Sequence, residues 1–218
     1  MSKLIAYFGG SFDPIHQGHL ATARELVDVF ALAKLVFLPA ALSPLKQQSL
    51  ASLHRVAMLK LAIQDDSVFA IDEQELHRPQ PSYTIDTLRC LRTQYGTQQS
   101  LAFIMGMDSF LSLPKWRDWQ QLTDFAHLIV VSRPDYDAQL RTELQAWLNN
   151  RRCNDRLLLE YQTHGLVYFV ATQPHAVSST DIRARLALGQ NTSATLPPRV
   201  AAYIQLHHLY GATATNES

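Results

Sequence analysis

Two histidines and three glycines lie close together near the start of the chain. Gly9 and Gly10 are adjacent, and Gly18 lies between His16 and His19. A glycine pair lets the backbone approach a ligand closely and point amide N–H groups at it. The two histidines are three residues apart, so on a helix they share one face, from which two imidazoles can donate hydrogen bonds to phosphate oxygens. The segment therefore predicts a phosphate site.

The elements expected around this segment favour the same interpretation. An apolar run over 4–8 predicts a buried strand, and apolar residues at helical spacing predict a helix over 20–30, with its start near Gly18. In doubly wound folds, phosphates favour the first βα turn, where a helix N-terminus offers unpaired N–H groups and the positive end of its dipole. The alternative is an ordinary turn with polar surface histidines, which two glycines alone would favour.

A second candidate phosphate site lies late in the chain, at Ser178, Ser179, Thr180 and Arg183. Ser178 has the form of a helix cap with Asp181 three positions on, so a helix is expected from there to about 188. Hydroxyl groups, the first N–H groups of that helix and the donor fork of Arg183 suit a polyphosphate. Taken alone, such a segment is more often a capped helix with a solvent-facing arginine.

Predicted strands and helices alternate along nearly the whole chain. Further strands are expected over 35–38, 68–71, 101–105, 127–131 and 167–170, and further helices over 52–63, 82–95, 138–148 and 197–207. This alternation predicts an α/β fold with a doubly wound parallel sheet and a small C-terminal helical part. We expect a single domain over 1–210 and a disordered tail over 211–218.

The composition is that of an ordinary globular protein. The 218 residues include 19 basic and 19 acidic ones, and this neutral balance gives no support to a nucleic-acid-binding role. Cys90 and Cys153 are far apart and form neither a disulfide framework nor a CxxC metal site. No apolar run approaches the length of a membrane span or a signal peptide, so we expect a soluble cytoplasmic protein without membrane contact.

The string around the histidines resembles the signature of the HxGH nucleotidyltransferase superfamily, which is related to class I aminoacyl-tRNA synthetases. The matching residues are Gly9, Gly10, Phe12, Asp13, Pro14, His16, Gly18 and His19. The resemblance implies that His16, His19 and Arg183 hold the triphosphate of ATP and stabilise charge in the transition state, and that neither histidine is a nucleophile. The other ATP-binding residues implied are Gly9, Gly10, Ser11, Phe12, Gly18, Lys46, Gly106, Ser178, Ser179 and Thr180. The lysine-rich signature loop of the synthetases has no counterpart in this sequence.

Four further strings, at 81–84, 106–109, 113–119 and 131–134, are similar to the bacterial nicotinate-mononucleotide adenylyltransferases, and the similarity runs in order over 3–210. The mononucleotide-binding residues that it implies are Ser82, Tyr83, Thr84, Asp108, Trp116, Arg117 and Arg133. In that family pattern, Trp116 stacks on the nicotinate ring, and backbone N–H groups near Thr84 and Arg117 receive the carboxylate. Asp108 contacts the ribose or phosphate, and Arg133 lies near the phosphate. Three of these residues have a plainer alternative. Trp116 could be a packing residue, Asp108 a helix cap and Arg133 a surface residue.

The chain departs from the family pattern after the second strand. The family usually shows Pro-Pro-His and a basic residue, whereas this chain has Ser43, Pro44, Leu45 and Lys46. At the histidine position of that pattern the chain has Leu45, whose side chain cannot make the contact that the resemblance implies for the histidine. Lys46 is expected to reach ATP or pyrophosphate, with a solvated loop lysine as the alternative.

The resemblance implies transfer of the AMP part of ATP to nicotinate mononucleotide, giving deamido-NAD and pyrophosphate. Mg²⁺ is expected to be bound mainly by the ATP phosphates, without a protein metal site, and a preference for the acid over the amide is inferred from the resemblance alone. The alternatives are another HxGH transferase (a phosphopantetheine adenylyltransferase or a cytidylyltransferase), a non-catalytic nucleotide sensor and, last, a nucleic-acid-binding protein. A homo-oligomer is allowed, since the sequence does not give the oligomeric state.

Overall fold

The computed structural model of the chain describes residues 3–41, 50–79, 81–132, 140–173 and 177–212. The departure from the family pattern at Leu45 lies outside the described residues, and so do Lys46 and Arg133. The contacts expected of Lys46 and Arg133 therefore stay predictions.

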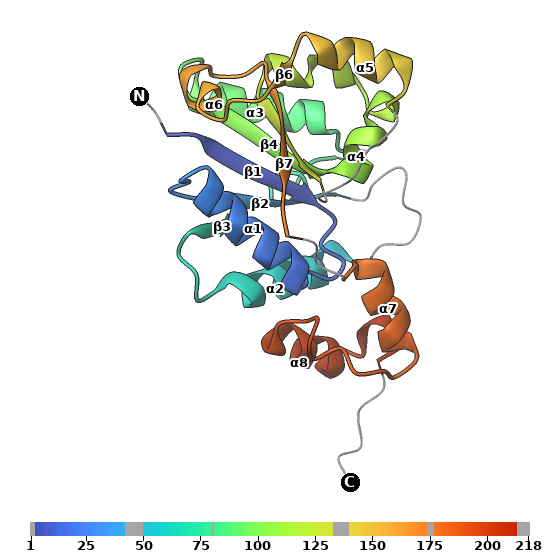
Figure 1. Ribbon diagram of the computed structural model, residues 1–218. Coiled ribbons are helices and arrows are strands. Elements are labelled where there is room, and N and C mark those ends of the chain that lie inside the picture. The colour runs from blue at the N-terminus through green and yellow to red at the C-terminus, as the bar shows by residue number, and fades with distance from the viewer. Residues whose placement is uncertain (1–2, 42–49, 80, 133–139, 174–176, 213–218) are drawn as a thin grey trace.

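A parallel sheet forms the centre of the described fold (Figure 1). Its strands are β1 (Ile5–Gly10), β2 (Leu35–Pro39), β3 (Phe69–Ile71), β4 (Leu101–Gly106), β5 (His127–Ser132), β6 (Arg152–Cys153) and β7 (Val167–Ala171). They lie in the order β3-β2-β1-β4-β5-β7-β6, and every neighbouring pair is parallel. The chain order reverses between β1 and β4, which confirms the predicted doubly wound sheet. Of these strands, only the two-residue β6 was not expected.

The bounds of the helices are α1 (Gln17–Val29), α2 (Ser52–Ile63), α3 (Thr84–Tyr95), α4 (Met107–Leu111), α5 (Thr142–Asn149), α6 (Leu158–Tyr161), α7 (Ser179–Ala187) and α8 (Pro198–Leu206). Helices α1 to α6 lie between strands along the chain, as the alternation predicted, and α7 and α8 follow the last strand. The predicted helix over 82–95 begins two residues late because Tyr83 is extended (φ −119°) and caps α3. The segments α4 and α6 and the 3-10 turns Leu113–Lys115 and Trp119–Asp124 were not predicted, since they are too short for a helical period to show in the sequence.

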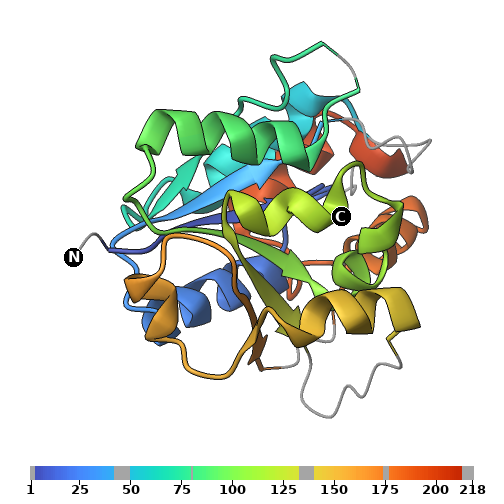
Figure 2. The same ribbon diagram turned by 90° about the horizontal axis from the view of Figure 1, so that it is seen from above.

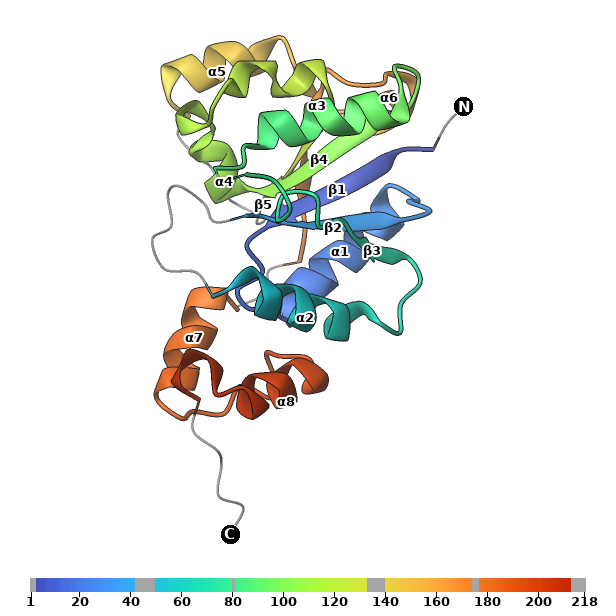
Figure 3. The same ribbon diagram turned by 180° about the vertical axis from the view of Figure 1, so that it is seen from behind.

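Side chains alternate between the two faces of the sheet, and each face has its own apolar cluster. In β1, Ala6 and Phe8 belong to one cluster and Tyr7 to the other. The first face carries α1 and α2, with α7 and α8 beyond them, and the second carries α3, α4 and α5 (Figures 1 and 3). Seen from above, α3 and α5 lie over the sheet (Figure 2). Burial on both faces explains why the strands read as apolar runs in the sequence.

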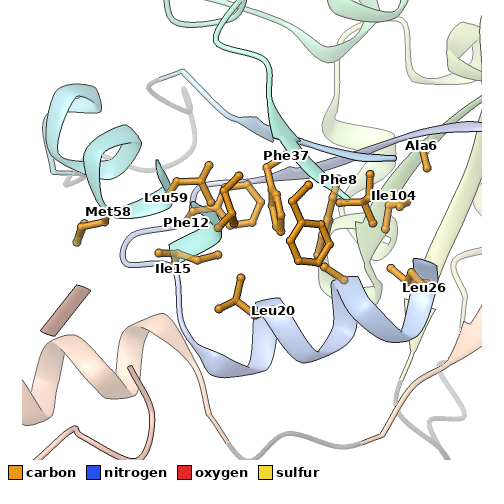
Figure 4. Packing of buried hydrophobic residues seen from close by; sticks show 14 of the residues in the cluster. Ala6, Phe8, Phe12, Ile15, Leu20, Leu26, Phe37, Met58, Leu59 and Ile104 are labelled. Carbon is orange, nitrogen blue, oxygen red and sulfur yellow. The ribbon is translucent and has the colours of Figure 1, made fainter. Parts of the chain in front are cut away.

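The loop between β1 and α1 is part of the hydrophobic core. Phe12 and Ile15 are almost completely buried and lie among side chains from β1, β2, α1 and α2 (Figure 4). The Phe12 ring meets the Phe37 ring edge-on, with centroids 5.4 Å apart. A loop whose side chains fill a core has little freedom to move, so whatever it presents to a ligand is held in place.

The C-terminal helical part that the sequence predicted consists of α7 and α8 (Figure 1). Val200 and Ile204 of α8 are buried in the same cluster as α2 residues. The turn η3 (Leu209–Gly211) follows, and Ala212 is buried as well. The packed chain thus continues to Ala212, and the rest of the expected tail, 213–218, lies outside the described residues. In the part of the chain that the structure describes, no helix combines the length and apolar character needed to cross a membrane.

Arg92 of α3 fastens loops at the amino ends of the strands, away from the ends where ligands bind in this fold class. Its guanidinium donates to the backbone carbonyls of Gly96, Gln99, Phe125 and Thr163 at 2.6–3.0 Å. Partial burial removes water from the Arg92 guanidinium and lowers its pKa. The four carbonyls replace part of that water as hydrogen-bond partners of the charge. One side chain therefore fixes the approaches to β4, β5 and β7.

We expect Arg92→Lys to lower the free energy of unfolding by about 2 kcal/mol, because one ammonium group cannot reach carbonyls on three separate loops. Arg89→Lys is the matched control, since Arg89 lies on the same helix and makes exposed contacts with Gln121 and Asp118. Urea unfolding of both variants measures the difference. Equal small losses in the two variants would contradict the role given to Arg92.

Candidate functional site

A cavity of about 160 Å³ lies at the carboxyl ends of β1, β2 and β4, where the chain order reverses. Doubly wound folds bind ligands at this place, and the volume is close to that of cavities that hold a benzene-sized ring. The cavity is lined by Gly9, Gly10, Ser11, Leu38, Ala40, Ala41, Arg55, Glu75, Thr84, Phe103, Met105, Ser109 and Trp116. It thus brings together predicted ATP-binding residues from β1 and two predicted mononucleotide-binding residues, Thr84 and Trp116.

Gly9 and Gly10 have a packing role that the sequence did not indicate. A Cβ added to Gly9 would lie 2.3 Å from Cζ of Phe103, and one added to Gly10 would lie 2.8 Å from Cζ of Phe12. Neither glycine is among the residues with positive φ. Their backbone lines the cavity, as close approach to a ligand requires, but aromatic rings inside the protein also exclude any side chain.

His16 and His19 lie face to face at the start of α1, with ring centroids 3.7 Å apart and planes inclined by 23°. His16 is the N-cap of the helix, and its Nδ1 accepts a hydrogen bond from the backbone N–H of His19 at 3.3 Å. Because Nδ1 accepts, the neutral His16 ring carries its proton on Nε2. The predicted shared face of the two imidazoles is present.

His19 is enclosed by aromatic rings. Those of Phe12 and Phe8 have centroids 5.2 and 6.5 Å from its own. Burial, and next the neighbouring His16, hold the pKa of His19 well below its usual range. Its Nδ1 is buried without a hydrogen-bond partner among the described residues. A neutral imidazole with an unpaired polar atom gains a hydrogen bond and proton affinity when an anion binds beside it.

The second predicted phosphate segment lies against the histidine loop, although 165 to 170 positions separate them in the sequence. Arg183 Nη1 donates to the backbone carbonyl of Asp13 at 2.7 Å. Ser179 Oγ donates to the carbonyl of Pro14 at 3.0 Å. The amino ends of α1 and α7 are therefore joined, with both predicted anion-binding segments at the junction.

Ser178 caps α7 as predicted, because its Oγ accepts a hydrogen bond from the N–H of Asp181 at 3.1 Å. Thr180 Oγ1 accepts from Arg183 Nη2 at 3.3 Å. Gly18 lies close to Val177, just before the cap: a Cβ on Gly18 would meet Val177 Cγ1 at 2.8 Å. Hydroxyls and guanidinium are thus held around one helix N-terminus, the arrangement that the sequence indicated.

Trp116 and Trp119, three residues apart, have different environments. Trp116 lines the cavity together with Thr84. Trp119 is buried and packs on Trp147, with ring centroids 5.2 Å apart. The spacing alone could not tell which of the two faces a ligand.

Tyr83 and Arg117 also come together, since the Arg117 guanidinium carbon lies 4.9 Å from the centroid of the Tyr83 ring. Ser82 Oγ is buried without a hydrogen-bond partner in the described structure. Gly106 and Asp108 lie exposed at the start of α4 and are not among the cavity-lining residues. The structure therefore places five of the six described mononucleotide candidates at α3 or around Trp116, and Asp108 on the neighbouring helix.

Two charged residues in the cavity wall were missed by the sequence analysis. Arg55, 1% exposed, donates to the carbonyls of Ser11, Ala40 and Leu50 at 2.6–3.2 Å. Glu75 is also buried; desolvation raises its pKa, and its carboxyl accepts a hydrogen bond from a threonine of α3. For Arg55, the sequence offered one signal of burial, a charged residue next to the apolar face of the predicted helix over 52–63. For Glu75 it offered none.

The cytidylyltransferase-like family matches residues 7–185 of the chain. Curated relatives named "Probable nicotinate-nucleotide adenylyltransferase" include one from Yersinia pestis (strain Pestoides F), 43% identical over 210 residues, which cover 95% of this chain and 96% of the relative. Another, from Sodalis glossinidius (strain morsitans), is 44% identical over 95% of this chain and 97% of its own length.

Among solved structures, the chain is similar to a nicotinic acid mononucleotide adenylyltransferase of Plasmodium falciparum complexed with NaAD. The TM-score is 0.75 at 17% sequence identity, and the alignment covers 97% of this chain and 98% of that one. A second structure of the Plasmodium enzyme, complexed with APC, gives a TM-score of 0.69. At this identity the likeness concerns the fold, and it agrees with the sheet order described above.

We expect Gly9→Ala to lower the free energy of unfolding by about 1–3 kcal/mol, because its methyl group overlaps the buried Phe103 ring. Gly106→Ala is the matched control at the end of β4, where an added Cβ meets nothing within 4 Å, and it should change stability by less than about 0.5 kcal/mol. Urea unfolding compares the two, and a neutral Gly9→Ala would show that Phe103 yields easily.

Proposed function

The chain belongs to the nicotinate-nucleotide adenylyltransferase family, and we propose that it transfers the AMP part of ATP to nicotinate mononucleotide, forming deamido-NAD and pyrophosphate in NAD biosynthesis. The observation that carries the proposal is the junction of the two anion-binding segments. Arg183 of α7 bonds to the carbonyl of Asp13, in the loop that leads to His16 and His19. Beside that junction lies a ring-sized cavity with Trp116 in its wall.

The chemistry asks the protein for positioning and charge neutralisation. The phosphate monoester of the mononucleotide is already an anion at neutral pH, so its oxygen attacks the α-phosphorus in line without a general base. The bond from the α-phosphorus to the β-phosphate bridging oxygen breaks, and pyrophosphate leaves with the electron pair. His16, His19 and Arg183 hold the triphosphate and stabilise the charge that spreads over its oxygens.

In this proposal the nicotinate ring lies in the cavity, against the wall formed by Trp116 and Thr84. Tyr83 caps α3 without a side-chain hydrogen bond, and the N–H groups of Thr84 and Ile85, which have no intrahelical partner, suit a carboxylate. An amide would turn its own N–H₂ group toward these donors and leave them poorly paired, which favours the acid. Arg117 over the Tyr83 ring adds a positive charge near the same helix start.

We assign the Mg²⁺ of this reaction to the substrate, as MgATP. Within the described residues, no group of three or more His, Cys, Asp or Glu side chains is placed to hold an ion. Phosphate oxygens and water are the ligands that Mg²⁺ usually keeps in such reactions.

The proposal is tested by pyrophosphate release with ATP, Mg²⁺ and each of three acceptors: nicotinate mononucleotide, nicotinamide mononucleotide and phosphopantetheine. We expect release mainly with the nicotinate compound, because its carboxylate alone pairs with the first N–H groups of α3. Release mainly with another acceptor would overturn the substrate assignment, and no release with any of them would leave nucleotide binding without transfer.

We expect His16→Ala and His19→Ala each to lower turnover at least about tenfold while the fold persists, because each removes a preorganised donor to the triphosphate. His77→Ala is the matched control, since the His77 side chain is 76% exposed and meets only Glu73 at 4.0 Å. Turnover of all three is measured by pyrophosphate release, with circular dichroism as the check on folding. Wild-type turnover in both site variants would contradict this mechanism.

A further inference from the structure

The Asp13 carboxylate ties the histidine loop to the C-terminal end of the described chain. Its Oδ1 accepts a hydrogen bond from the Tyr210 hydroxyl at 2.6 Å, across 197 positions in the sequence. Its Oδ2 accepts from the backbone N–H of Leu50, just before α2, at 3.4 Å. Asp13 is 5% exposed, so both bonds go to a buried carboxylate, and bonds to a charged group are stronger than bonds between neutral groups.

Arg55 holds the same loop from its other side. Its Nη1 donates to the carbonyl of Ser11 at 2.6 Å, and the nearby Asp13 charge opposes the lowering of the Arg55 pKa by burial. Two buried groups of opposite charge thus lie near each other at the turn from Ser11 to Asp13. The Asp13 charge offsets part of the cost of burying the Arg55 guanidinium.

Both ends of the contact between Asp13 and Tyr210 have a left-handed backbone that bulky residues rarely adopt. Phe12, directly before Asp13, has φ 46°, and Tyr210 has φ 59°. Such conformations persist only where the surroundings determine them, and they concentrate at functional sites. Core packing fixes the backbone conformation of Phe12. The backbone conformation of Tyr210 is fixed by its neighbours Leu209 and Ala212, which are both buried. The hydroxyl of Tyr210 is therefore delivered to Asp13 from a defined direction.

We propose that Tyr210 is a positioning residue for the transfer reaction. It is not among the residues that line the cavity, and it acts through Asp13, whose carboxylate it holds and whose carbonyl receives Arg183. Fixing Asp13 sets the path of the chain into His16 and the direction of Arg183 at the same time. Through Tyr210, the C-terminal helical part thereby orients the donors of the histidine loop together with its own Arg183. The inference rests on the proposed function.

The test compares Tyr210→Phe with Tyr203→Phe. Each variant loses one hydroxyl from the C-terminal part; that of Tyr203 bonds to His54 Nδ1 at 3.0 Å, away from the loop. We expect Tyr210→Phe to lower kcat about tenfold with KM for nicotinate mononucleotide within about twofold, because misplaced donors weaken the transition state more than ground-state binding. Tyr203→Phe should keep kcat within about twofold. Wild-type kcat in Tyr210→Phe, or equal losses in both variants, would overturn the inference.

A second readout does not depend on turnover. Amide hydrogen exchange over 11–19 should be faster in Tyr210→Phe than in the wild type and unchanged in Tyr203→Phe, since only the first loses a bond to the loop. If the wild type shows no transfer to nicotinate mononucleotide, the proposed function fails while this readout still tests the positioning. Unchanged exchange in Tyr210→Phe overturns the inference whatever the wild type catalyses.

Discussion

The loop between β1 and α1 must belong to the hydrophobic core and also carry the proposed phosphate site, and the rest of the structure follows from that constraint. Phe12 and Ile15 are buried in the cluster beneath the sheet, while Ser11 faces the cavity and His16 caps α1. Apolar and polar residues alternate along this short segment. Packing of the apolar side chains fixes the loop, and its hydrogen-bond donors are thereby held in place. Donors that are already in place need no reorganisation when charge develops on a ligand.

Burying such a loop brings charged groups away from water, and the fold compensates each of them. Arg55 satisfies three backbone carbonyls and opposes the charge of Asp13, which in turn receives the Tyr210 hydroxyl. His19 is kept neutral by its aromatic surroundings and has a buried nitrogen without a partner. The site therefore has a polar atom that lacks a partner among the described residues until a ligand supplies one, beside charged groups that are hydrogen-bonded within the protein.

The two ends of the sheet are specialised. At the carboxyl ends of β1, β2 and β4, glycines, a ring-sized cavity and two helix starts leave space and donors for ligands. At the amino ends, Arg92 closes the loops against one another through backbone carbonyls. The cavity thus lies at the end of the sheet where doubly wound folds bind ligands, and the Arg92 contacts lie at the opposite end.

The sequence by itself determined the order and type of the main elements, the parallel sheet and the Ser178 cap, and it indicated the two segments proposed to bind phosphate. These depend on periods, glycines and caps that act over a few residues, and local patterns of that kind are visible in one chain. The same local information could not reveal that Trp116 lines the cavity while Trp119 packs on Trp147. Only the tertiary structure decided that, together with the roles of Arg55, Glu75 and Tyr210. Apart from the contact of Arg55 with Leu50, their hydrogen-bond partners lie 12 to 197 positions away, at separations that no local period encodes and that only the folded chain closes.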